Sequence, residues 1–307
     1  MAKLVDALDL GSSAARRGGS SPSIRTKPFR GLSSVGRAPD LHSGGQEFDP
    51  PRLHQTYTGN YMKYRLPFTK ETTYTRHGWF QYAMVLSLPF SFYFLTLEQW
   101  VYSLLVGYVL AIIGQIVGHH RYFSHRSFKL NIFWHYVLCY LTTVLSIGSV
   151  LEWRRMHLAH HKYSDTQYDP HSPTYKGILK VFFISWFDYP QGVAISEESE
   201  KLKSEKGIVF FHTYYVYIIL FHIAIVSLID PKLLYALYFF PPFLALSMGS
   251  LVNSLLHNEN GPKDNILLAF IAGGDGYHAI HHEKPYLANY PFPDLAGMII
   301  SLIKKKE

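Results

Sequence analysis

The stretch Glu152-Trp-Arg-Arg-Met-His157-Leu-Ala-His160-His161-Lys-Tyr-Ser-Asp165 decides how the rest of the chain is interpreted. Its three histidines stand at positions i, i+3 and i+4, which share one face of a helix. Neutral imidazole is the commonest side-chain metal ligand, so three rings on one face can converge on an ion. An isolated pattern of this kind is as often an ordinary helix surface. Alone it predicts a helix and leaves metal binding open.

Further histidine clusters settle that question in favour of a metal site. They are His120-Arg-Tyr-Phe-Ser-His125, Asn253-Ser-Leu-Leu-His257 and His278-Ala-Ile-His281-His282. Four or five ligands saturate one ion, so nine imidazoles predict two metals. The adjacent His119 could replace His120, but the five-residue separation from His125 favours His120. The candidate ligands are His120, His125, His157, His160, His161, Asn253, His257, His278, His281 and His282.

The composition points to a membrane protein. The chain has 307 residues, of which 48% are hydrophobic, and the apolar residues gather in blocks of about twenty. The net charge of +7 suits an anionic membrane surface or an anionic substrate head group. No basic groove motif supports nucleic-acid binding. The single cysteine, Cys139, excludes an intramolecular disulfide and a cysteine-rich metal site.

Five apolar blocks cover about 79–97, 100–117, 131–151, 208–229 and 233–256. The histidine clusters can share a site only if they lie on one side of the membrane. The block at 131–151 stands between the first two clusters, so we expect it to lie in the interface or to re-enter rather than cross. The sequence therefore predicts an all-α integral membrane protein with four transmembrane helices and a helical cap that holds the dimetal site.

Charge gives the predicted orientation. Lysines and arginines surround the histidine clusters and end the chain, whereas the loops on the opposite side hold only Glu98, Asp230 and Lys232. By the positive-inside rule, both termini and the metal site face the cytoplasm. We expect a multi-pass protein of a bacterial inner membrane.

Residues 1–61 differ from the rest of the chain. They are rich in Gly, Ser, Arg and Pro and contain no continuous apolar core, which excludes a secretory signal peptide. One interpretation is a disordered arm. The other is a spurious extension, because Leu4–Ser13 and Gly31–Leu53 look like translated transfer-RNA genes, with the true start at Met62. The functional domain is then predicted to cover 62–307.

Metal-bound histidines usually need an oxygen partner on the second ring nitrogen. We expect one or two such partners among the carboxylates beside the clusters, which are Glu152, Asp165, Asp169, Asp275 and Glu283. His171, which follows Asp169-Pro170, is a further candidate for an outer position.

The ordered set of motifs resembles the membrane fatty acid desaturases, most closely the delta-9 acyl-CoA desaturase group. The resemblance rests on the three histidine clusters, Asp169-Pro170-His171 and Asn253-Ser-Leu-Leu-His257, and covers most of residues 75–295. It implies a diiron centre that uses molecular oxygen to insert a cis double bond, of the delta-9 type, into a long-chain saturated acyl thioester or acyl lipid. Spacing alone does not choose the metal, because imidazole also suits zinc, copper and nickel.

The resemblance also implies how the ligands are shared between the two irons. One iron takes His120, His161, His257 and His282, with Asn253 acting through a water. The other takes His125, His157, His160, His278 and His281.

The expected partners follow from the same resemblance. They are a long-chain acyl substrate, membrane lipid, and a separate electron donor of the ferredoxin, rubredoxin or cytochrome b5 type. Arg154, Arg155 and Lys162 could hold a phosphate-bearing head group such as coenzyme A; the alternative is an ordinary basic membrane flank.

Two other functions remain open at this point. A membrane diiron hydroxylase of fatty acids or alkanes uses similar clusters. A histidine-rich metal carrier would place ionisable residues at mid-membrane depth, where these blocks are nearly free of charge.

Overall fold

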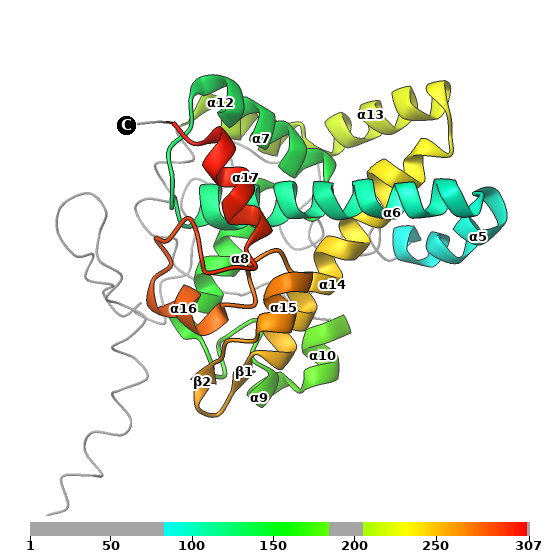
Figure 1. Ribbon diagram of the computed structural model, residues 1–307. Coiled ribbons are helices and arrows are strands. Elements are labelled where there is room, and N and C mark those ends of the chain that lie inside the picture. Colours follow the sequence, from blue (N-terminus) through cyan, green and yellow to red (C-terminus); the bar gives the residue numbers. More distant parts are fainter. Residues whose placement is uncertain (1–82, 184–204, 306–307) are drawn as a thin grey trace, which may run out of the picture. The chain divides into compact units, whose positions relative to one another are not determined.

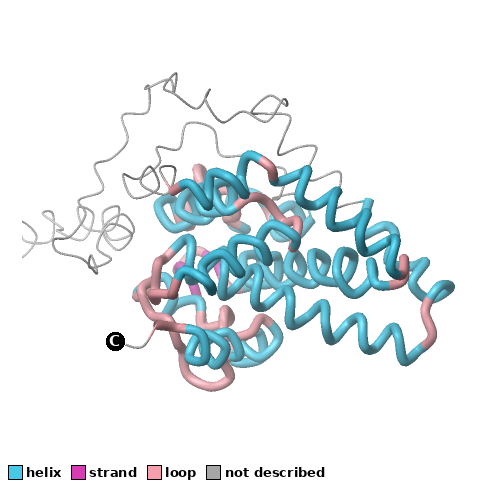
Figure 2. The backbone as a smooth tube through the Cα atoms, turned by 90° about the horizontal axis from the view of Figure 1, so that it is seen from above, coloured by secondary structure: helices cyan, strands magenta, loops and turns pink. Residues whose placement is uncertain are grey.

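The computed structural model describes residues 83–183 and 205–305. The extension 1–61 and the predicted start at Met62 lie outside the described residues. Helices make up nearly all of the regular structure in the described part (Figure 2), where the strands are β1 (His257–Asn258) and β2 (Gly261–Pro262), which pair antiparallel. The helical class predicted from the sequence is therefore confirmed.

One long helix carries the first histidine cluster at its end. Helix α6 (Leu97–Ala111) begins at a capping box in which Thr96 and Gln99 bond each other's backbone N–H groups, and it runs straight into the π-helix η3 (Ile112–Ser124) (Figure 1). Together they form an apolar helix of 28 residues. At ~1.5 Å per residue this is about 42 Å, longer than a hydrocarbon core of about 30 Å.

The second long apolar helix joins the π-helix η5 (Tyr235–Phe239) to α14 (Phe240–Leu255), 21 residues in all. Pro241 and Pro242 stand where the π-helix η5 passes into α14. Helix α14 packs on α6 so closely that a Cβ at Gly107 would lie 2.7 Å from the Cβ of Phe240. The packing of α6 on α14 brings the histidines at the end of η3, His120 and His125, near His257, which follows α14.

A third apolar segment is bent. Helices α12 (Lys206–Thr213) and α13 (Tyr215–Ile229) meet at 67° and count as one membrane span only if the pair is taken together. The first predicted block is described only from Ala83, as a shorter helix, Ala83–Phe94, that includes η2 (Leu88–Phe90) and α5 (Ser91–Phe94). The described residues therefore contain two candidate spans, or three with the bent pair, and the predicted number of four is not reached.

Helix α7 (Ile132–Val144) covers most of the predicted interfacial block. Its 13 residues are fewer than the ~20 that a crossing needs. It packs against η3, which also contacts α8 (Val150–Tyr163) and α17 (Leu295–Ile303). The remaining helices are α9 (Pro173–Lys176), α10 (Ile178–Phe183), α15 (Ile266–Ile271) and α16 (His278–Glu283).

The core lies around η3. Ile112, Ile116 and Val117 of this helix are at most 1% exposed and pack with Leu138 of α7 and Ile300 of α17. Large apolar side chains are instead exposed along α6 and α13, for example Leu105 and Phe221. Such surfaces suit contact with lipid. The core thus packs α7, α8 and α17 against η3, the helix that carries the first histidine cluster.

Candidate metal centre

Helix α8 presents the second histidine cluster. It begins at a capping box in which the Ser149 hydroxyl accepts a hydrogen bond from the Glu152 N–H and the Glu152 carboxylate accepts one from the Ser149 N–H. The Ser149 hydroxyl is also 2.7 Å from Nδ1 of His212. This fixes the register of α8 and therefore the directions of its three rings.

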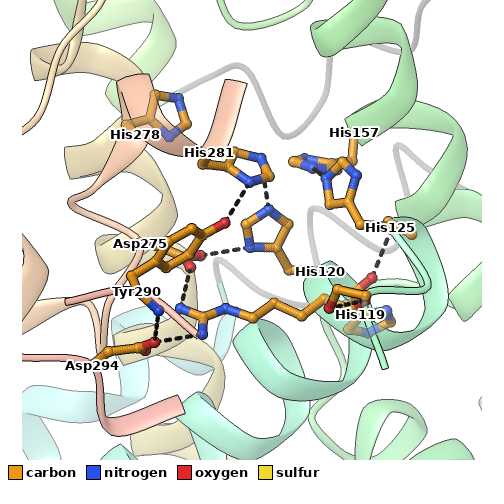
Figure 3. A network of polar contacts seen from close by, with 12 residues as sticks. His119, His120, His125, His157, Asp275, His278, His281, Tyr290 and Asp294 are labelled. Carbon is orange, nitrogen blue, oxygen red and sulfur yellow. Dashed lines mark hydrogen bonds and ion pairs between the residues drawn. The ribbon is translucent and has the colours of Figure 1, made fainter. Parts of the chain in front are cut away.

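The nine candidate histidines form two compact groups. Within each group the ligand atoms lie within 4.8 Å of one another. The first group contains His120, His125, His157, His161 and His281, and the second contains His160, His257, His278 and His282. Figure 3 shows His120, His157 and His281 of the first group turned toward one another.

This division differs from the one implied by the resemblance, and helical geometry explains it. His157 and His161 are four residues apart on α8 and join one group, whereas His160 points to the other. The same holds on α16, where residues 278 and 282 share the second group and 281 joins the first. The nine histidines come together, but their grouping does not support the predicted assignment of ligands to the two metals.

The five-residue separation in the first cluster has a local cause. In the π-helix η3 backbone hydrogen bonds run from residue i+5 to residue i, and the N–H of His125 donates to the carbonyl of His120 at 3.1 Å. Residues five apart therefore face nearly the same way, which places His120 and His125 in one group.

The rings converge through their Nε2 atoms. In the first group, His125 and His157 bring their Nε2 atoms to 2.6 Å, and His120 and His281 bring theirs to 3.0 Å. In the second group, the Nε2 atoms of His257 and His278 lie 2.8 Å apart. Each group therefore gathers ring nitrogens around a common centre.

Three aspartates hold the opposite ring nitrogens. The Nδ1 atom of His120 lies 2.8 Å from Asp275, that of His160 lies 2.9 Å from Asp169, and that of His257 lies 3.0 Å from Asp165. A carboxylate accepts the Nδ1–H proton and so leaves Nε2 with its lone pair. Of the five carboxylates considered, the other two do not contact a ring: Glu152 caps α8, and the Glu283 side chain is 72% exposed.

Sequence reasoning missed a second layer of support. The Tyr290 hydroxyl lies 3.0 Å from Nδ1 of His281, and the Arg121 guanidinium lies over the Tyr290 ring. Arg121 also donates to Asp294 at 2.9 Å and to Asp275 at 3.4 Å. No periodic pattern marks Tyr290. The position of Arg121 directly after His120 is the only local signal.

Burial sets the protonation of the rings. It lowers the pKa of His157, His161 and His281 well below the usual range, and the neighbouring imidazoles lower it further. The rings are therefore neutral, the form that binds metals. His160 differs: burial opposes its charged form, but the Asp169 carboxylate outweighs burial and raises its pKa.

The residues present fit two imidazole-bound ions. The buried Nε2 of His160 has no hydrogen-bond partner within the described part of the chain. At His120 and His257 the Nδ1–H group donates a hydrogen bond to a carboxylate, so Nε2 carries the lone pair. These Nε2 lone pairs face other ring nitrogens at close range. Lone pairs opposed in this way repel unless a cation or proton lies between them. The opposed lone pairs are therefore better explained by bound metal ions than by hydrogen bonds between the rings.

The other predicted site residues lie in different surroundings. Asn253 and His171 line a cavity beside the histidine groups, together with Trp153 and rings of both groups. Arg154 is buried and donates to the backbone carbonyls of Phe123 and Ser124. Arg155 and Lys162 are half-buried on α8. Arg154 thus ties α8 to the end of η3, which leaves Arg155 and Lys162 as the accessible cations of the predicted set.

Comparison with known proteins agrees with this architecture. A sequence model described as fatty acid desaturase matches residues 95–306, which include both histidine groups. The chain belongs to the fatty acid desaturase family. It is 31% identical over 214 residues to stearoyl-CoA desaturase of Sus scrofa, a match that covers 61% of this chain and 58% of that protein.

Other relatives give the same picture. Identity is 32% over 204 residues with acyl-CoA desaturase of Ovis aries, and 30% over 204 residues with stearoyl-CoA desaturase of Homo sapiens. Each of these two matches covers 58% of this chain and 55% of the relative. The chain therefore matches little more than half the length of these curated relatives.

Proposed function

We propose that the protein is a membrane-bound acyl desaturase that inserts a cis double bond, of the delta-9 type, into a long-chain saturated acyl group. The observation that carries the proposal is the pair of largely buried histidine groups, with one aspartate on a ring nitrogen of the first group and two on ring nitrogens of the second. Such a donor set offers neutral nitrogen ligands to two ions and shields them from water. The relatives named stearoyl-CoA desaturase support an acyl-CoA as the carrier.

The chain would hold two iron ions, one in each group. The first group would bind one iron through five imidazoles. The second would bind the other through four, with Asn253 close by on the same cavity wall, in place to act through a water. When bound, the irons supply the oxygen chemistry that removes two hydrogens from adjacent methylenes.

The protein's own residues supply position and exclusion of water. Asp275, Asp169 and Asp165 fix the directions of three rings, and the rings of both groups border the cavity that would admit the acyl chain. Arg155 and Lys162, near the second cluster, are the proposed contacts of the head group. The two electrons would come from a separate donor of the ferredoxin, rubredoxin or cytochrome b5 type.

The proposed topology keeps four crossings with both termini and the metal centre in the cytoplasm. The helix Leu97–Ser124 and the helix Tyr235–Leu255 provide two crossings, and the bent pair Lys206–Ile229 provides a third. The first apolar block, described from Ala83, would provide the fourth. The basic residues beside the histidine clusters support the cytoplasmic side.

The purified protein tests this proposal directly. It is loaded with iron, supplied with an electron donor and oxygen, and incubated with isotopically labelled stearoyl-CoA. We expect a labelled monounsaturated acid. A hydroxylated product without an alkene would favour the hydroxylase, and metal uptake without oxygen consumption would favour the metal carrier.

A further inference from the structure

Gln115 stands in one row with two histidines of the first group. It precedes His120 by five residues, as His120 precedes His125, and all but the last lie within the π-helix η3. Because the hydrogen bonds of a π-helix join residues five apart, the side chains of Gln115 and His120 lie on the same side of the helix, and both line one cavity. Gln115 is therefore the next side chain along this face, one turn nearer the apolar part of the helix.

Gln115 lines the cavity beside the metal centre. The rings of His120, His157 and His278 border this space. The rest of the lining is mostly apolar, and the cavity volume is about 50 Å³. The apolar wall residues are Ile116, Met156, Met248, Gly249, Val252 and Ala272. A saturated acyl chain bound here would pass both the histidine rings and the Gln115 amide.

The amide oxygen of Gln115 has no hydrogen-bond partner among the described residues. Gln115 is 5% exposed, and its Oε1 atom is buried without a hydrogen bond from any described residue. Leaving such a group unpaired costs roughly 1–3 kcal/mol. A saturated acyl chain has no donor to offer, whereas a water molecule has two. Asn253 and Trp153 line the same cavity and carry polar groups, and a bound water needs two to four polar partners.

We propose that Gln115 is a specificity-determining residue of the desaturation. Its amide holds a water molecule against the cavity wall, and this water keeps methylene groups of the acyl chain out of the corner of the cavity beside Gln115. The inference rests on the proposed function. A methylene group that displaced the water would leave Oε1 unpaired, so the chain takes the remaining path. That path sets which two carbons lie beside the histidine groups.

The first test compares Gln115→Met with the wild type. Methionine has similar length but cannot bond the water, so the chain can enter the corner. We expect iron content to be retained and the share of alkenes at other positions to rise about fivefold, from loss of one hydrogen bond. Gln115→Asn, which keeps the amide, should preserve the wild-type pattern. Gln167→Met, on an exposed loop residue, is the matched control and should change nothing.

Two outcomes separate this inference from the proposed function. A wild-type protein that makes no alkene contradicts the function itself. Alkene formation with an unchanged isomer pattern in Gln115→Met contradicts only the role of Gln115.

A second test needs no variant and so does not depend on folding. Hydroxystearates with the hydroxyl group at successive mid-chain carbons are used as inhibitors of the wild-type enzyme. A hydroxyl group placed at the corner can donate to Oε1 in place of the water. We therefore expect one position to bind about fivefold tighter than unsubstituted stearate. Equal binding at every position would overturn the proposal.

Discussion

The carboxylate of Asp275 lies 2.8 Å from Nδ1 of His120, although the two residues are 155 positions apart. The contact joins the end of η3 to the loop before α16. His120 is buried and Asp275 is half-buried; desolvation raises the pKa of Asp275, but the His120 and Arg121 side chains together hold it below its usual range. The carboxylate therefore stays charged and fixes the His120 ring with Nε2 directed into the first group.

Replacing Asp275 tests this contact. Asp275→Asn keeps the shape but removes the charge, so His120 loses the acceptor that orients it. We expect affinity for metal at the first group to fall about 10–100-fold, as measured by metal titration with competing chelators. Glu283→Gln is the control, since that carboxylate lies beside the same cluster and is 72% exposed. Equal affinities in both variants would argue against an orienting role for Asp275.

The two histidine groups predict separable metal sites. His281→Ala removes a ligand from the first group only, and His278→Ala removes one from the second. We expect each variant to retain close to one equivalent of iron where the wild type holds two, as counted by elemental analysis. His161→Ala should match His281→Ala, because both rings belong to the first group. If His161→Ala instead affected the site of His257, the division into groups would be incorrect.

Arg121 supports the first group from behind. Its buried guanidinium contacts Asp294 and Asp275, so Arg121→Gln would leave the buried Asp294 and the half-buried Asp275 without this cation. Breaking such a pair costs roughly 3–5 kcal/mol. We therefore expect a clear loss of thermal stability and of bound metal in detergent. Lys129→Gln, at an exposed position in the same segment, should leave both unchanged. Unaltered unfolding of Arg121→Gln would contradict this role.

The sequence predicted that the nine histidines come together, but it did not predict how they divide into two groups. Spacings of three and four residues placed His157, His160 and His161 on one helix, and that prediction held. The division between the metals was taken from a resemblance, whereas the four-residue spacing of His157 and His161 already places them together. The π-helix that places His120 and His125 in one group cannot be predicted from the spacing of apolar residues.

Contacts distant in sequence were the hardest to predict. Asp165, Asp169 and Asp275 stood beside histidine clusters, so proximity in sequence marked them as candidates. Tyr290 contacts His281 from a loop, and no spacing in the sequence predicts this contact. The predicted spans depended on apolar length alone, and that measure could not foresee the 67° bend between α12 and α13.

The central claim is that the two histidine groups catalyse desaturation. Its most direct test is fatty acid analysis of desaturase-deficient cells that express the full-length wild type or His157→Ala. We expect the wild type to restore a monounsaturated acid with one double-bond position. His157→Ala should reach the membrane at the same level and yield no double bond. Retained unsaturation in His157→Ala, or a wild type that yields only hydroxylated acids, would contradict the account.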